Sequence, residues 1–115
     1  MPVQTIQSDW VPIGYARFGT LSSAITVGST APTAGTAYGS LTLNGLSVQP
    51  RRALIDAETQ NVRVRDDGTA PTGTEGQLIK AAATAPQEVI GTDAIRNLKI
   101  IEAAVSAAVT IRYYV

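Results

Sequence analysis

Four carboxylates lie near the middle of the sequence and are the residues best suited to chemistry. Asp56 and Glu58 are followed by the adjacent pair Asp66 and Asp67. Carboxylate oxygens bind hard cations such as calcium, but a calcium site needs about six oxygen ligands, and the Asp-Asp-Gly spacing does not match an EF-hand loop. Because Asp and Gly are the residues that a tight chain reversal requires, we interpret residues 66–68 as a turn.

Other kinds of active site also lack support. Paired carboxylates can catalyse glycoside hydrolysis in a cleft lined by aromatic residues, but no aromatic residue lies between Tyr38 and Tyr113. The chain has no His and no Cys, so the usual general base and thiolate ligands are missing. No pattern supports a Ser-Lys pair with Lys80 or Lys99, and the stretch Gly68 to Gly76 lacks the ending of a phosphate-binding loop. We therefore predict no catalytic, metal-binding or cofactor-binding residue and no enzyme activity.

Large aromatic residues and arginines are the candidates for contact with a partner protein. Both residue types are enriched at protein interfaces, where Lys is depleted, and the chain has seven Arg but only two Lys. The predicted partner-binding residues are Trp10, Tyr15, Phe18, Arg51, Arg52, Arg63 and Arg65. Two alternatives stay open: the aromatic side chains could pack on their own domain, and the arginines could pair with Asp66, Asp67 and Glu58.

The charge and hydropathy of the chain limit the kinds of partner that it could bind. The 9 basic and 9 acidic residues cancel, so the chain has no net field that would attract nucleic acid or an anionic membrane. The first ten residues lack the features of a signal peptide, and no apolar run reaches membrane-spanning length. We expect a protein made in the cytoplasm that binds neither nucleic acid nor membrane. Its small-residue, Ala-rich core should gain stability from neighbouring subunits.

The order of turn residues and alternating segments predicts an all-β fold. Residues 1–20 resemble an extended N-terminal arm with a short strand, and residues 21–115 are expected to form a single antiparallel β-sandwich that is jelly-roll-like. Alternation predicts strands at 21–27, 40–46, 51–58, 62–65, 77–79, 89–90, 97–103 and 109–115, with Asn44-Gly45 as a hairpin turn. The segment 92–109 is ambiguous between helix and strand, because Ile95, Leu98 and Val105 also suit a helix with Thr92 as its N-cap.

Several strings in the chain resemble one family. These are A-L-I-D-A-E at 53–58, V-R-V-R-D-D-G-T-A-P-T at 62–72, G-Q-L-I at 76–79, A-I-R-N-L-K-I-I-E-A at 94–103 and V-T-I-R-Y-Y-V at 109–115. Together they resemble a group of small structural proteins of tailed bacteriophages, and the resemblance covers residues 21–115. The chain departs from the group's pattern at Val64, where the group often has an aromatic residue, and in the loop at 28–39.

The resemblance implies a component of the phage particle. We expect a capsid decoration or cement protein that binds the major capsid protein or other virion proteins as a homo-oligomer, with a trimer as the expected form. A head-to-tail connector, or a tail or fibre-associated subunit, is the alternative within the same particle. From another class, a carbohydrate-binding β-sandwich module would use Trp10, Tyr15 or Tyr38 as stacking platforms.

Overall fold

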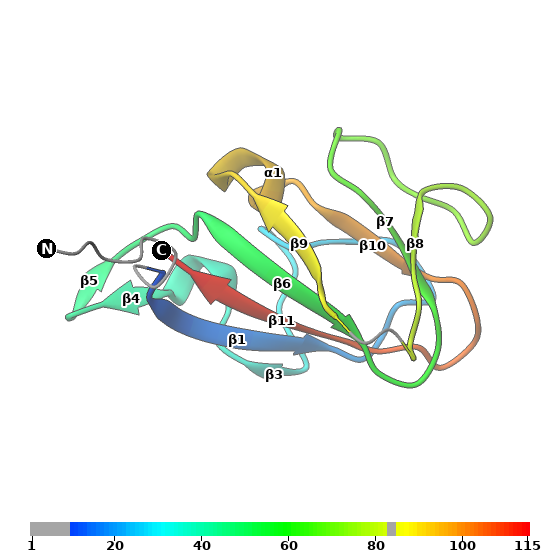
Figure 1. The fold of residues 1–115 in the computed structure, drawn as a ribbon, viewed down its shortest axis with the longest axis horizontal. Helices are drawn as coiled ribbons and strands as arrows, with labels where there is room; N and C mark the ends of the chain where they lie inside the picture. The colour runs from blue at the N-terminus through cyan, green and yellow to red at the C-terminus, as the bar shows by residue number, and fades with distance from the viewer. Residues whose placement is uncertain (1–9, 83–84) are drawn as a thin grey trace, which may run out of the picture.

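The computed structural model describes residues 10–82 and 85–115 and has the predicted all-β class, with antiparallel pairing throughout the described ladders (Figure 1). The strands are β1 (Pro12–Phe18), β2 (Ile25–Thr26), β3 (Ala34–Gly35), β4 (Thr42–Leu43), β5 (Leu46–Ser47), β6 (Arg52–Ala57), β7 (Val62–Arg65), β8 (Gln77–Ile79), β9 (Gln87–Ile90), β10 (Lys99–Glu102) and β11 (Val109–Tyr114). A 3-10 helix, η2 (Tyr38–Ser40), and a short α-helix, α1 (Thr92–Arg96), complete the described elements. Within these ranges, no helix is long and apolar enough to cross a membrane.

The larger sheet has five strands in the order β3-β1-β11-β6-β9. The C-terminal strand β11 lies near its centre, paired with β1 on one side and with β6 on the other. Two backbone hydrogen bonds between Val11 and Val115, of 2.8 and 2.9 Å, extend the β1–β11 ladder beyond the strand ends. The end of the chain is thus held between two neighbouring strands.

The position of β1 changes the predicted division into arm and domain. Residues 12–18 are paired with β11 along the strand, and Ala16 and Arg17 also face β3 on the other side. This part of the predicted arm is therefore an internal strand of the sheet. Residues 1–9 of that arm lie outside the described residues.

The smaller sheet has four strands in the order β2-β10-β7-β8. The alternation predicted for residues 62–65 is confirmed, because Val62 and Val64 are buried while Arg63 and Arg65 lie on the other side of the strand and are half-buried. The hairpin β4–β5 turns at Asn44-Gly45, where both residues have positive φ, of 55° and 82°. That geometry is the reason why Asn-Gly pairs mark tight hairpins.

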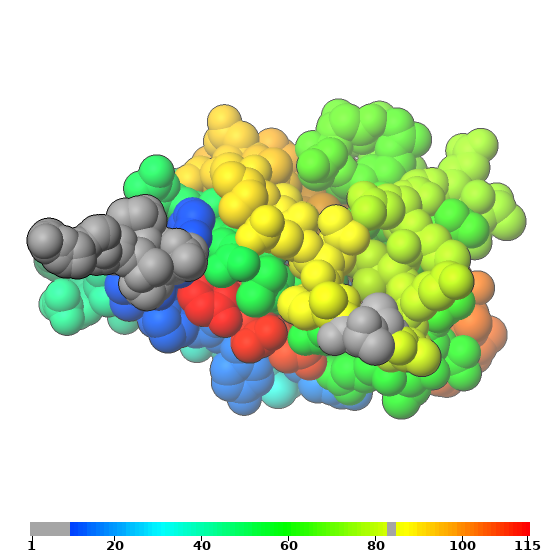
Figure 2. All heavy atoms as spheres, viewed as in Figure 1, coloured from blue at the N-terminus to red at the C-terminus, as the bar shows by residue number. Residues whose placement is uncertain are grey.

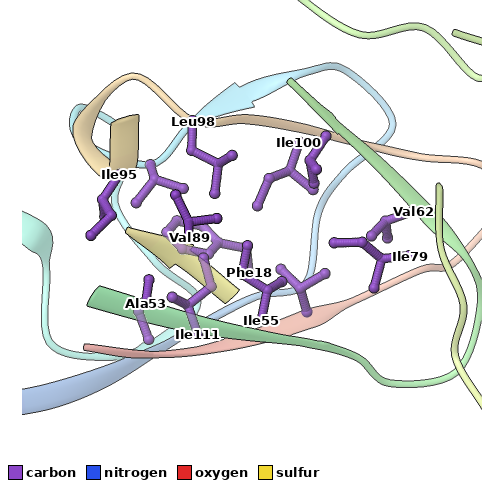
Figure 3. Close-up of a cluster of buried hydrophobic side chains, with 14 of the residues drawn as sticks. Phe18, Ala53, Ile55, Val62, Ile79, Val89, Ile95, Leu98, Ile100 and Ile111 are labelled. Carbon is purple, nitrogen blue, oxygen red and sulfur yellow. The ribbon is translucent and has the colours of Figure 1, made fainter. Parts of the chain in front are cut away.

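Side chains from both sheets meet in one apolar core (Figure 3). Ile55 and Ile111 from the five-stranded sheet and Val62 and Ile100 from the four-stranded sheet have no exposed surface. Burying a side chain of this size completely contributes about 1.5–3 kcal/mol. The core is therefore the main source of the domain's stability, and it fixes which face of each strand looks outward.

Three segments differ from the predicted elements. In the run 40–46, Ser40 ends the 3-10 helix η2, only Thr42 and Leu43 form β4, and Leu46 already belongs to β5. In the run 21–27, only Ile25 and Thr26 form a strand, because the chain bends at Ser22 and Ser23. The ambiguous segment contains both elements in turn, α1 at residues 92–96 and β10 at residues 99–102. Thr92 does not cap the helix: Gly91 holds the N-cap position, and the Thr92 hydroxyl instead donates to the carbonyl oxygen of Pro50 at 3.2 Å.

Candidate interaction surface

The five-stranded sheet presents one broad outward face, which is seen in front in Figure 2 as adjacent blue, red, green and yellow strands. The register places outward residues in rows across β1, β11, β6 and β9, since residues directly opposite each other share a face. We call this the outer face and define it by Tyr15, Arg17, Arg52, Leu54, Asp56, Glu88, Ile90, Thr110, Arg112 and Tyr114, together with Trp10 beside Arg52 and Glu58 beside Arg17.

Arg52 is the centre of an aromatic cluster at one end of the outer face. Its guanidinium carbon lies 5.5 Å from the centre of the Trp10 ring and 5.6 Å from that of the Tyr114 ring. Its Nε also donates to a carboxylate oxygen of Glu88 on β9. A guanidinium held by two rings and a carboxylate keeps little rotational freedom, so this cluster is pre-organised for contact.

A second cluster lies at the opposite end of the same face. The Arg17 Nε donates to both carboxylate oxygens of Glu58, at 3.1 and 3.0 Å, and the Thr110 hydroxyl donates to one of them at 2.6 Å. These two donors, with the Thr110 hydroxyl the stronger influence, hold the pKa of Glu58 below its ordinary value of 4.5. Glu58 is therefore ionised at neutral pH and is unsuited to act as a general acid.

The lowered pKa of Glu58 predicts how the stability of the fold depends on pH. Because the folded state favours the ionised form of Glu58, its contribution is complete well above pH 4.5 and is lost as the pH falls through the lower folded pKa. For this partly exposed pair we expect Glu58→Gln to lower the free energy of unfolding by about 0.2–1 kcal/mol at pH 7. Urea denaturation of both proteins from pH 7 to pH 3 should show the difference shrinking on acidification. A difference that grows instead would contradict this role.

Apolar and aromatic groups also reach solvent on the outer face. Tyr15 is 52% exposed and Ile90 56% exposed. Between them in the sheet, Arg112 lies 3.9 Å from the carboxylate of Asp56. Large exposed aromatic side chains among arginines are typical of protein–protein contact surfaces, in which Trp, Tyr and Arg supply most of the binding energy.

The structure brings together only some of the predicted partner-binding residues. Trp10, Tyr15 and Arg52 all lie at the outer face. Phe18 does not: it is 3% exposed and packs in the core, so it is not available to a partner. Two members of the surface, Arg112 and Tyr114, were missed, although the alternation in residues 109–115 already placed them opposite the buried side of their strand.

The four arginines among the predicted partner-binding residues do not share one sheet. Arg52 belongs to β6 in the five-stranded sheet, whereas Arg63 and Arg65 belong to β7 in the four-stranded sheet. Arg51 is exposed just before β6 and makes no side-chain ion pair among the described residues. Arg63 holds the loop that follows its own strand, since it donates to the carbonyl oxygens of Gly73 at 3.2 Å and Gly76 at 2.9 Å.

The acidic turn has a structural role at Asp67. One of its carboxylate oxygens accepts the backbone N–H of Thr69 at 3.2 Å, and both face the Arg65 guanidinium. These hydrogen bonds, that from Arg65 first, hold the pKa of Asp67 below its ordinary value of 3.8. Gly68 then reverses the chain with a φ of 86°. The alternative in which an arginine pairs with the acidic turn thus holds for Arg65, while Glu58 pairs with Arg17, which was not among the candidate arginines.

Potential metal ligands do not gather elsewhere in residues 10–82 and 85–115, where no group of three or more acidic side chains could hold an ion. Comparison with protein-family models, with curated proteins and with solved structures gave no match to this chain.

Proposed function

We propose that this protein is a non-enzymatic structural component of a tailed-phage particle, a capsid decoration or cement protein whose outer face binds the head shell. The observation that carries the proposal is the outer face itself, with Arg52 fixed between Trp10, Tyr114 and Glu88. By clamping adjacent capsid subunits, such a protein would stabilise the shell against internal pressure.

Charge pairing on the outer face favours a protein partner over nucleic acid. Each of its three arginines faces a carboxylate: Arg17 faces Glu58, Arg52 faces Glu88, and Arg112 faces Asp56. A surface that binds phosphates needs unpaired positive charge, because affinity for nucleic acid comes largely from neutralising phosphates. The neutral, aromatic-rich outer face fits the major capsid protein or another virion protein.

The proposed architecture is an antiparallel β-sandwich that is jelly-roll-like, with the two sheets enclosing the shared core. In this arrangement the outer face is free to meet a shell while the four-stranded sheet looks away from it. We propose a homo-oligomer on the particle, with the trimer as the expected form, and assembly from protein made in the host cytoplasm.

The resemblance of residues 62–72 to phage structural proteins supports a role of this chain in the phage particle, but it does not say where in the particle the chain lies. A head-to-tail connector, or a tail or fibre-associated subunit, remains the alternative. The carbohydrate-binding alternative loses one platform, because Tyr38 is buried. It also loses much of a second, because one face of Trp10 lies against Arg52.

The proposal is tested by quantifying the protein in purified particles of the phage that encodes it. A copy number comparable with that of the major capsid protein is expected of a decoration protein. A copy number that fits a single ring would assign the chain to the neck or tail. Absence from the particle would overturn the virion role altogether.

A further inference from the structure

The outermost strand of the five-stranded sheet, β9, carries backbone groups that point away from the sheet. The Gly91 N–H donates to the carbonyl oxygen of Arg51, just before β6, at 2.9 Å, and the Glu58 N–H, just after β6, donates to the carbonyl oxygen of Ala108 before β11 at 2.8 Å. In an antiparallel ladder the bonding direction alternates from one residue to the next, so the even-numbered residues of β6 bond β11 and the odd-numbered ones bond β9. On β9, the residues that bond β6 are therefore Gln87 and Val89. The N–H and C=O groups of Glu88 and Ile90 therefore face outward, and β9 has no second partner strand among the described residues. The Glu88 carbonyl accepts one long hydrogen bond from its neighbour, from the Gln87 Nε2 at 3.4 Å, which an incoming strand would have to replace.

Compared with the other described sheet edges, β9 is the one best able to accept another strand. The edge strands β2 and β3 have two residues each, and β8 has three, whereas β9 has four. Natural edge strands are commonly protected by Lys, Pro or a bulge, and residues 87–90 contain none of these. The one charge, on Glu88, is neutralised by Arg52 on the outer face, and Ile90 beside it is 56% exposed.

Open space borders this edge. A hollow of about 440 Å³ is lined by β9 on one side and by β7, β8 and the residues that join them on the other, with Leu98 also in its lining. Its apolar lining includes Val64, Val89, Ile90 and Leu98. A strand that joined β9 would cover the apolar part of this lining and satisfy the outward backbone groups together.

We propose that β9 pairs with β9 of a second copy of this chain, as antiparallel strands related by a two-fold axis. The axis passes between the two Val89 residues, and Glu88 of each copy lies opposite Ile90 of the other. In this register each copy donates the N–H groups of Glu88 and Ile90 and accepts at their carbonyls. A register centred on Glu88 would place two carboxylates directly opposite each other, which is destabilising. One centred on Ile90 would extend the pairing to Gly91, where the strand ends.

The expected association is weak. Stable interfaces bury about 1,200–2,000 Å² in total, and a four-residue edge supplies only a small part of that. The contact would be populated where copies are held close together, as on a particle surface. In that respect the inference rests on the proposed self-association. A two-fold contact joins copies in pairs and cannot by itself close a ring of three, so the proposed trimer would need a second, separate contact.

Disulfide trapping tests the contact in purified protein without any shell. The chain has no Cys, so a single introduced thiol can cross-link only to its counterpart. Facing residues that are not hydrogen-bonded have Cα atoms about 4.5 Å apart, within the range of about 4.4–6.8 Å that a disulfide needs. Under oxidised glutathione, which takes up the two electrons and two protons, Val89→Cys should form a covalent dimer.

The matched control is Val105→Cys, whose side chain is 78% exposed in the turn after β10. We expect Val89→Cys to cross-link at least about tenfold faster than this more accessible thiol, because pairing raises the effective concentration of the two sulfurs. A rate equal to or below that of Val105→Cys, in a variant whose melting curve shows that it is folded, would overturn the proposal.

Charge changes at residue 90 test the register. In the Val89→Cys background, Ile90→Glu should slow cross-linking, because it places a second carboxylate opposite Glu88 of the other copy. Ile90→Lys should leave the rate unchanged or raise it, because Lys faces that carboxylate. Equal slowing by both variants would indicate hydrophobic association in another register and would contradict the proposed pair. Because no shell is present, these outcomes do not depend on the virion role.

Discussion

Replacing Ile111 with alanine is expected to lower the free energy of unfolding by about 2–5 kcal/mol. Ile111 lies in the middle of β11, paired with Ala16 on one side and Ile55 on the other, and it has no exposed surface. Its truncation removes apolar contacts between two neighbouring strands and leaves a cavity that a sheet cannot easily close. Urea denaturation followed by circular dichroism measures the loss directly.

The matched control for this prediction is Leu46→Ala. Leu46 lies at the β4–β5 hairpin and is 71% exposed, so its truncation should change stability by no more than about 0.5 kcal/mol. If Ile111→Ala were no more destabilising than Leu46→Ala, β11 would not be the central strand of the core.

Reversing the charge of Arg52 is expected to weaken binding to the head shell by about 30-fold or more, the effect of losing a residue worth at least about 2 kcal/mol. Arg52→Glu removes the contacts with Trp10 and Tyr114 and places a carboxylate beside Glu88. Titration of purified shells with labelled protein measures the change in affinity. Because Arg52 is partly exposed and its ion pair is close to the surface, the fold should be retained.

Arg51→Glu is the control for Arg52→Glu. It makes the same change of charge one residue earlier, at an exposed side chain without an ion pair in the described ranges. Its affinity for shells should stay within a few-fold of the wild-type value, the range of near-neutral interface positions. Equal losses for the two variants would show that net charge, and not the Arg52 cluster, determines binding.

Local features of the fold were predictable because they depend on neighbouring residues. The alternation in 52–57 and 62–65 follows from the period of a strand, and the turns at Asn44-Gly45 and Asp67-Gly68 follow from residues that tolerate positive φ. Short elements were harder: α1 has only five residues, too few for a helical period to separate it from the strand that follows.

Features that depend on distant pairing were not predictable. The order of the strands in the sheets decides whether an outward arginine contacts another arginine, a carboxylate or a loop carbonyl. That order cannot be read from the local sequence. Arg52 and Arg63 look alike in the sequence, yet they belong to different sheets, and Arg63 bonds the 69–76 loop. Phe18 likewise looked like part of an arm until β1 was placed inside the sheet.

A cryo-EM reconstruction of the mature particle tests the central claim most directly. We expect density for this chain on the outside of the head, with Arg52 and Tyr114 of the five-stranded sheet and the adjacent Trp10 packed against capsid subunits. Density with the outer face turned to solvent, or confined to the neck or tail, would contradict it.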